Sequence, residues 1–329
     1  MIVTSTDRDL SSYKTTGSVF SEMSERLLKA DLHCHSYFSG KTAHVKLLEP
    51  MDSYSSPETI YRLAKKRGMD LVTITDHDSI EGCLHLLNKD PDKLRDFIIG
   101  EEVTCPLPEF QCKIHIAVYD INEEQHREIT RLKGDFNELM GYLRSQKILH
   151  GLNHLLFEFP PPEHARAFVE KMLANFVLFE GWNGAIGSRQ NELVSRVLRR
   201  VPGKILIGGS DAHTLLRLAS SYTLAPGRDK KEFLESIRQG KTSIRGKDGY
   251  FFHVFYDAMG VYLNYFGDVA FRNEVHRAWS TYKKMRNSFG WAFYLPVWFV
   301  LSLSYTFFMC RLTAYRHPYH ESLLNEIVP

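Results

Sequence analysis

Two histidines, His33 and His35, stand two positions apart in the stretch Ala-Asp-Leu-His-Cys-His-Ser at residues 30–36. The stretch starts apolar and has no helical period, and alternate side chains of an extended strand face one side. Both imidazoles would then point the same way, with Leu32 and Cys34 on the opposite side. Two neutral imidazoles on one face make half of a metal site, although one such pair also fits ordinary strand histidines.

More groups that can bind metals follow other predicted strands. His77 comes directly after the β-branched run at 70–75, and Glu102 comes shortly after the apolar run at 97–99. Across the whole chain, the candidate metal ligands are His33, His35, His77, Glu102, His115, His154, Asp211 and His213.

The elements that carry these residues alternate between strand and helix. Short apolar runs are separated by helical segments such as the one that begins at Ser56-Pro57, where serine can cap a helix and proline fits its first position. About seven such units predict an α/β fold with a mostly parallel sheet, closed or nearly closed into a barrel. In a barrel, residues at the carboxyl ends of the strands converge on one mouth.

The donor types indicate which cations would fit. Imidazole and carboxylate ligands without thiolate suit zinc, manganese or iron, and there are more ligands than one tetrahedral ion needs. We therefore expect two or three divalent ions. A bridging carboxylate such as Glu102 would hold two ions at a distance where they share a hydroxide, which is a strong nucleophile at neutral pH.

Composition excludes several other classes. The 329 residues carry 41 basic and 39 acidic side chains, so there is no overall positive field for a nucleic acid. Five cysteines, none in a C-x-x-C pair, argue against a disulfide framework and a cysteine zinc finger. The first thirty residues hold no apolar core of seven, so we expect no secretory signal and a cytoplasmic protein.

Five motifs together resemble the polymerase and histidinol phosphatase (PHP) superfamily over about residues 29–245. In chain order they are Asp31-Leu32-His33-Cys34-His35-Ser36, Thr75-Asp76-His77-Asp78, Gly100-Glu101-Glu102, Asn153-His154 and Gly209-Ser210-Asp211-Ala212-His213. The resemblance implies a distorted seven-stranded (β/α) TIM-like barrel with a metal cluster at its mouth. It also implies hydrolysis of phosphate esters.

Ligand roles follow from the same resemblance. The first ion would be held by His33, His35, Glu102 and Asp211. Glu102, preferred over Glu101 by the family's Gly-x-Glu spacing, would bridge to a second ion. The remaining assignments are His115 and His154 for the second ion, His77 and His213 for the third, and Glu102, Asp211 and His213 as catalytic residues.

One position departs from the family pattern. Many relatives have an aspartate after a serine in the first loop, where this chain reads Ser39-Gly40. A ligand of the third ion is then missing, with three alternatives: His44 replaces it, the third ion binds weakly, or the third site stays empty.

Other charged residues near these motifs have supporting roles in this interpretation. We expect Asp31, Asp76 and Asp78 to orient the imidazoles, because metal-bound histidines usually donate their other nitrogen to a carboxylate or carbonyl. Arg189 and Lys41 could hold a substrate phosphate, and a solvated charge is the competing interpretation for each.

The alternation of strand and helix stops near Gly249. We divide the chain into a leader at 1–28, a barrel at 29–248 and a helical extension at 249–329. Within the extension, 287–310 contains 24 residues without a charge, which is long enough to cross a bilayer and would leave the barrel in the cytoplasm. An apolar helix packed on the barrel or on a partner subunit is the alternative.

Taken together, these features predict a metal-dependent phosphoesterase that acts on a small phosphorylated substrate. Hydrolysis of an amide or another non-phosphate bond by the same cluster is a second hypothesis, because metal-bound hydroxide also attacks carbonyls. A non-catalytic metal-binding or membrane-tethered scaffold is a third. No motif for stacking bases stands out, so a nucleic-acid partner is not indicated.

Overall fold

The computed structural model describes residues 26–40, 52–247, 255–256, 259–260 and 291–328. Most of the expected leader, Lys41, His44 and residues 287–290 lie outside these ranges. β1 begins at Leu27, so the last two residues of the expected leader belong to the sheet.

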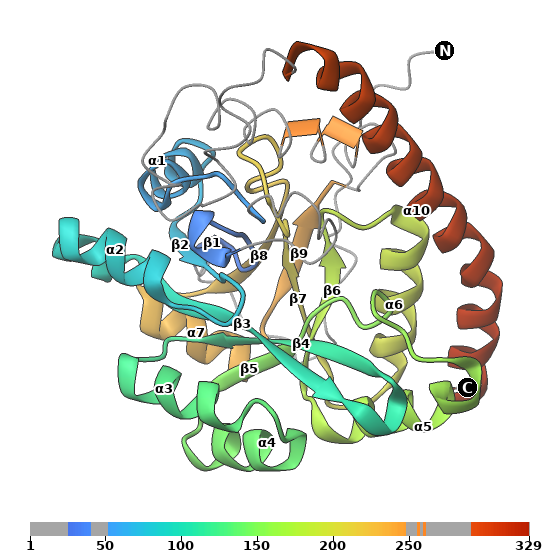
Figure 1. Cartoon of the computed structure of the whole chain (residues 1–329). Coiled ribbons are helices and arrows are strands. Elements are labelled where there is room, and N and C mark those ends of the chain that lie inside the picture. Colours follow the sequence, from blue (N-terminus) through green and yellow to red (C-terminus); the bar gives the residue numbers. More distant parts are fainter. Residues whose placement is uncertain (1–25, 41–51, 248–254, 257–258, 261–290, 329) are drawn as a thin grey trace.

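Within the described residues, nine strands form one sheet in the order β7-β6-β5-β4-β3-β2-β1-β8-β9 (Figure 1). The strands are β1 (Leu27–Asp31), β2 (Leu71–Ile74), β3 (Phe97–Leu107), β4 (Cys112–Tyr119), β5 (Leu149–Leu152), β6 (Leu178–Asn183), β7 (Ile205–Gly209), β8 (Ser221–Pro226) and β9 (Ser243–Gly246). The helices are α1 (Pro57–Lys66), α2 (Glu81–Lys89), α3 (Glu123–Leu132), α4 (Phe136–Ser145), α5 (Pro162–Asn175), α6 (Ser188–Arg200), α7 (Lys230–Arg238) and α10 (Trp291–Ile327). Short 3₁₀ turns are η2 (Tyr37–Ser39), η3 (Pro91–Arg95) and η4 (Pro108–Phe110).

The sheet is mixed, so the prediction of a mostly parallel sheet is wrong. β1 pairs in parallel with β2, and β2 with β3, as do β5, β6 and β7. β4 instead runs antiparallel to both β3 and β5, and β8 runs antiparallel to both β1 and β9. β3 and β4 form a hairpin through η4, and a hairpin needs no crossover helix to reverse the chain.

The sheet curls until the ends of β1 and β7 meet. Cys34 and Ala212 form a parallel bridge, the Asp211 amide donates to the His33 carbonyl over 2.7 Å, and the His35 amide donates to the Ala212 carbonyl over 3.0 Å. The result is the nearly closed α/β barrel that the sequence predicts, although the described sheet has nine strands where the family resemblance implies seven. This closure also brings the first and the last metal-binding motifs side by side.

Local sequence signals set several helix boundaries. Ser56 Oγ accepts the Thr59 amide at the start of α1, with Pro57 at the first helical position, as predicted. The segment 123–145 forms two helices, α3 and α4. The Asp135 carboxylate starts the second by accepting the amides of Asn137 and Glu138.

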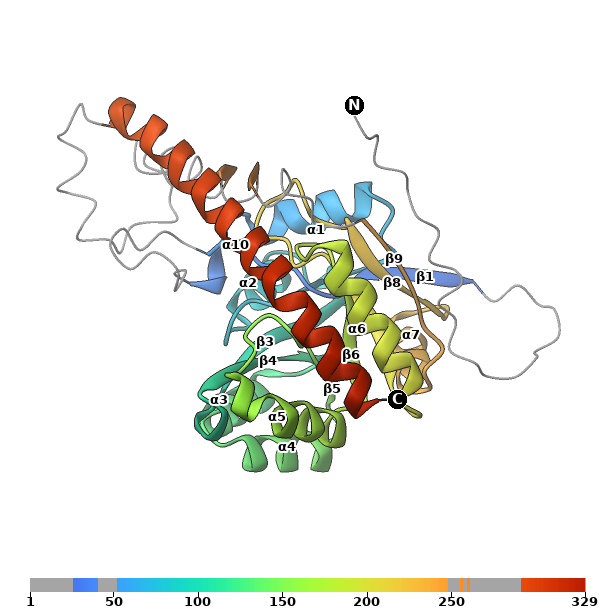
Figure 2. The ribbon, with the colours of Figure 1, turned by 90° about the vertical axis from the view of Figure 1, so that its right-hand side faces the viewer.

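The final helix, α10, lies across α5 and α6 along its C-terminal half (Figure 2). Leu324 and Val328 are buried in the same apolar cluster as the barrel strands, and Glu321 pairs with Arg196 over 2.5 Å. Earlier in the helix, Phe299 and Phe307 are about half exposed. No helix within the described residues is long and apolar enough to cross a membrane, so the expected membrane-spanning segment finds no support.

Candidate metal centre

The first two histidines project from the end of β1 into the mouth of the barrel. His33 and His35 are each 1% exposed, and their Nε2 atoms lie 3.2 Å apart. Cys34 points the other way, where its Sγ donates to the Thr73 carbonyl. The extended backbone therefore places the two imidazoles on one side and the Cys34 thiol on the other, as the sequence predicts. The Cys34 sulfur takes no part in the cluster.

Glu102 of β3 lies at the centre of the cluster and is 1% exposed. Its Oε2 lies 3.2 Å from His33 Nε2, 3.4 Å from His35 Nε2 and 3.2 Å from His77 Nδ1. A parallel bridge between His77, which follows β2, and Glu102, in the middle of β3, fixes this side of the arrangement.

The other oxygen of Glu102 faces a different pair of histidines. Oε1 lies 3.4 Å from His115 Nδ1 and 3.0 Å from His154 Nε2. Asn153 also donates its amide to Oε1 over 2.8 Å, which fixes the plane of the carboxylate. One carboxylate therefore connects two sets of imidazoles, which is the geometry of a bridging ligand.

Asp211 and His213 reach the same cluster from the end of β7. Asp211 Oδ1 lies 3.4 Å from His33 Nε2 and 3.3 Å from His35 Nε2. Asp211 and His154 both have positive backbone φ, 49° and 24°, a conformation that is unusual for residues other than glycine. Such strain is common where a fold places a side chain for function.

Asp52 is a member of the cluster that the sequence did not reveal. Its Oδ2 lies 3.1 Å from His213 Nε2, 3.8 Å from His77 Nε2 and 3.9 Å from His35 Nδ1. Asp52 thus supplies a carboxylate on the side assigned to a third ion. No strand end or local motif marks it, because it reaches the centre from the segment before α1.

The eight predicted ligands and Asp52 make four overlapping groups whose ligand atoms lie within 4.8 Å of one another. The groups are His33, His35 and Glu102; His33, His154 and Asp211; His77, Glu102 and His115; and His35, Asp52, His77 and His213.

These residues fit divalent cations. All the donors are imidazole nitrogens or carboxylate oxygens, which suits zinc, manganese or iron. Three buried atoms, Asp52 Oδ2, His77 Nδ1 and His115 Nε2, make no well-directed hydrogen bond to any described part of the chain. Buried polar atoms normally take part in a hydrogen bond. Ligand atoms that lie close together without well-directed hydrogen bonds are instead in the arrangement expected for ligands of a shared cation.

The charges of the cluster are strongly coupled. Burial raises the pKa of the Glu102 carboxyl, but His33, His115 and His77 outweigh it and hold that pKa well below the usual range. Burial lowers the pKa of His77 to about 4, which leaves it neutral and able to bind a metal. His213 differs, since the Asp52 charge overcomes burial and raises its pKa to about 10.

The three aspartates expected to orient imidazoles make other contacts. The Asp31 carboxylate accepts hydrogen bonds from the backbone amide and the hydroxyl of Ser210. The Asp76 carboxylate accepts the same two hydrogen bonds from Ser36. Asp78 pairs with Lys133 and accepts an amide of β3. These carboxylates fix the backbone of the ligand-bearing loops rather than the rings, so the predicted role is wrong in its detail.

Two other residues contact the outer nitrogens of the first histidine pair. Glu180 Oε1, at the centre of β6, lies 2.9 Å from His33 Nδ1, and Ser39 Oγ lies 3.1 Å from His35 Nδ1. Such partners fix the orientation of a ligating imidazole. The position of Glu180 directly after the apolar run at 176–179 is the sequence signal for its role.

Of the two predicted phosphate-binding residues, the structure describes Arg189, which is not part of the centre. Arg189 is an exposed residue of α6. Its backbone carbonyl accepts a hydrogen bond from the imidazole of His317 in α10. Lys41 and His44 lie outside the described residues.

Comparison with known proteins gives matches to parts of this chain. The model of the PHP-associated family matches residues 189–242, which carry the Asp211 and His213 motif. An uncharacterized protein of Methanocaldococcus jannaschii is 38% identical over 76 residues, a match that covers 23% of this chain and 44% of the relative, less than half of its length.

Solved structures with a similar course of the chain have low sequence identity. A two-domain protein from Bacteroides vulgatus containing a predicted PHP-like metal-dependent phosphoesterase is 18% identical, with 71% of each chain covered and a TM-score of 0.45. An amidohydrolase from Chromobacterium violaceum with bound sulfate and no metal is 14% identical, with 56% of this chain and 87% of that chain covered and a TM-score of 0.42.

The fold and the cluster define a barrel with a histidine and carboxylate centre for metals. The match of residues 189–242 to the PHP-associated family supports the resemblance to the PHP superfamily that the five motifs predict.

Proposed function

We propose that this protein is a metal-dependent hydrolase of phosphate esters with a small phosphorylated substrate. The observation that carries the proposal is the position of Glu102, whose two oxygens face two different sets of imidazoles. A carboxylate in this position can hold two cations close together, and a third can bind at the group that contains Asp52. Bound cations would supply a hydroxide nucleophile and neutralise charge on the phosphoryl group.

The protein residues have separate tasks in this proposal. His33, His35 and Asp211 would hold one cation beside Glu102, and the Glu180 carboxylate would keep the His33 ring oriented through its Nδ1 atom. Because the donors are fixed by the strand ends before any substrate arrives, little reorganisation accompanies the reaction.

The first test is the metal content per chain of protein purified without added metal or chelator, together with hydrolysis of p-nitrophenyl phosphate with and without Mn(II) or Zn(II). We expect two or three ions per chain and turnover that depends on metal. Metal-loaded protein that hydrolyses neither phosphomonoesters nor phosphodiesters would contradict the proposal.

A matched panel of amide substrates separates the proposal from the second hydrolase hypothesis. The same cluster that activates water for a phosphate can attack a carbonyl, so the two panels use the same preparation. A double substitution of His33→Asn and Asp211→Asn should abolish turnover on whichever panel is active. Turnover that survives the double substitution would place the reaction outside this centre.

A further inference from the structure

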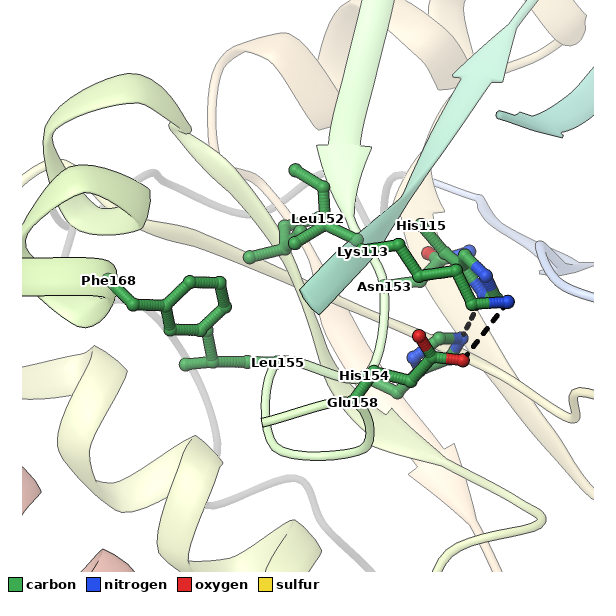
Figure 3. A pocket seen from close by; sticks show the side chains of 9 residues that line it. Lys113, His115, Leu152, Asn153, His154, Leu155, Glu158 and Phe168 are labelled. Carbon is green, nitrogen blue, oxygen red and sulfur yellow. Dashed lines mark hydrogen bonds and ion pairs between the residues drawn. The ribbon is translucent and has the colours of Figure 1, made fainter. Parts of the chain in front are cut away.

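A recess opens beside the side of the cluster formed by His115 and His154 (Figure 3). It contains about 240 Å³ of space, part of it open to solvent. Apolar side chains from β4, β5, α5 and the loop after β5 line its inner part. Lys113 and Glu158 are the charged residues on its outer part, and their side chains meet in front of the histidines in Figure 3.

The direction of β4 places Lys113 at the mouth of the barrel. Because β4 runs antiparallel to β3, its first residues lie beside the last residues of β3, where Thr104 pairs with His115 and Pro106 with Lys113. Lys113 and His115 are two positions apart on the strand, so their side chains share one face. Lys113 is therefore the next side chain outward from a metal-binding histidine.

Glu158 approaches from the loop after β5, the loop that also carries His154. Its Oε1 lies 3.2 Å from Lys113 Nζ, and the side chains are 39% exposed for Lys113 and 27% exposed for Glu158. An ion pair this exposed contributes little to stability. The fold therefore does not depend on the Lys113–Glu158 ion pair, and the pair is free to serve another role.

The negative charge of the carboxylates in the centre makes a nearby ammonium group useful for binding a phosphate. The cluster contains the carboxylates of Glu102, Asp211 and Asp52, which repel an incoming phosphate wherever cations do not neutralise them. Among the residues that line the recess, Lys113 is the basic one. Its flexible four-carbon stem allows Nζ to leave Glu158 and bind an anion nearby.

We propose that Lys113 binds the phosphate of the substrate, and that Glu158 holds the ammonium group at the rim until the substrate replaces it. The proposal rests on the phosphate-ester function argued above and names the residue that recognises the phosphate. Lys113 thereby takes the role that the sequence suggested for Arg189.

The test compares wild type, Lys113→Met, Glu158→Gln and Lys171→Met, all loaded with Mn(II). Inorganic phosphate is titrated into each protein by calorimetry, and kcat and KM are measured with p-nitrophenyl phosphate. Lys113→Met should weaken phosphate binding and raise KM about tenfold or more, because it removes a charged hydrogen bond to the anion. Metal content should remain that of wild type.

Glu158→Gln distinguishes a binding role from a merely structural one. If Glu158 competes with phosphate for Lys113, its neutralisation should tighten phosphate binding by roughly two- to fivefold. If the pair only ties the hairpin to the loop after β5, both substitutions should weaken binding in the same direction. That second pattern, or unchanged binding in Lys113→Met, would overturn the proposal.

Lys171→Met is the matched control. Lys171 of α5 pairs with Glu109 of η4 over 2.6 Å, so it also ties the β3–β4 hairpin to a neighbouring element, but it does not line the recess. It should leave phosphate affinity and KM unchanged, and an effect equal to that of Lys113→Met would overturn the proposal. Wild type that binds phosphate through Lys113 but hydrolyses no phosphate ester would refute the proposed function alone.

Discussion

The Asp52 amide donates to the Gly40 carbonyl over 2.8 Å. Gly40 is the position where the resemblance to the PHP superfamily leads us to expect an aspartate, and its φ of 78° is a conformation that glycine adopts without strain. The hydrogen bond brings a carboxylate from twelve positions later in the sequence to the loop that lacks one. The side chain of Asp52 then faces His213, His77 and His35.

Asp52→Asn should weaken the binding of one ion while the others stay bound. The amide removes a charged donor from one group of ligands but leaves the ligands around Glu102 intact. We expect affinity for the weakest-bound ion to fall at least ~10-fold, since even changes behind the ligands have effects of that size. Metal content after dialysis against graded chelator measures this, with the exposed Asp92→Asn as control. Unchanged metal content would show that Asp52 is no ligand.

Glu102→Gln should remove more than one ion and abolish turnover. Both oxygens of this carboxylate face imidazoles, so the amide nitrogen of glutamine would oppose one of the two sets. Glu101→Gln is a matched control at the adjacent position, where the carboxylate pairs with His126 over 2.9 Å and not with the cluster. Metal analysis and p-nitrophenyl phosphate hydrolysis of both variants show whether Glu102 or Glu101 bridges the ions. Loss of metal in Glu101→Gln alone would reverse the choice of bridging residue.

Local patterns were sufficient to predict much of the centre. The side chains of His33 and His35 follow directly from strand alternation, and His77, Asp211 and His213 follow from the ends of apolar strands. Glu102 could be chosen over Glu101 only through the spacing of the family motif. Alternation along β3 explains the choice, because adjacent residues of a strand point to opposite faces.

The missed features depend on contacts between distant segments. Asp52 reaches the cluster through a hydrogen bond to a loop twelve positions earlier, which no periodicity marks. The antiparallel direction of β4 depends on a hairpin, whereas the sequence pattern of apolar runs says nothing of strand direction. The position of Lys113 depends on the same hairpin, since a parallel β4 would place this residue at the far end of the barrel.

The pairing of His213 with Asp52 predicts a pH dependence of metal binding. The pKa of His213 is raised to about 10 in the metal-free protein, so this imidazole is protonated at neutral pH. A metal needs the neutral imidazole, so binding at this group should release a proton and tighten as pH rises toward 10. The stabilising effect of the protonated pair is present below pH 6.5 and lost as pH rises through about 10.

Mn(II) titrations at pH 6.5 and about pH 9, in buffers of different ionisation enthalpy, measure both affinity and proton release. Asp52→Asn is the informative comparison, because it removes the charge that raises the pKa of His213. That variant should release fewer protons than wild type at neutral pH. Equal proton release in the two proteins would show that His213 is not protonated before the metal binds.

A second pH effect should arise far from the centre, where α10 packs on the barrel. His320 is 6% exposed, and its ring packs at a tilt against that of Phe159, with 4.5 Å between the ring centroids. Burial, and then the charges of Arg316 and His317, lower its pKa to about 4. The unfolded chain therefore binds a proton near pH 6.5 that the folded chain does not bind until about pH 4, and stability falls as pH falls through this window.

His320→Phe should flatten this part of the stability curve, because phenylalanine keeps the ring packing without the proton. Urea unfolding between pH 4 and 6.5 should show wild type losing up to about 1.4 kcal/mol per pH unit more than the variant. His317→Gln is the comparison, since it removes only the smaller contribution of the His317 charge to the pKa of His320 and should flatten the curve less than His320→Phe. If His317→Gln flattened the curve and His320→Phe did not, the burial of His320 against Phe159 would not be the origin of the effect.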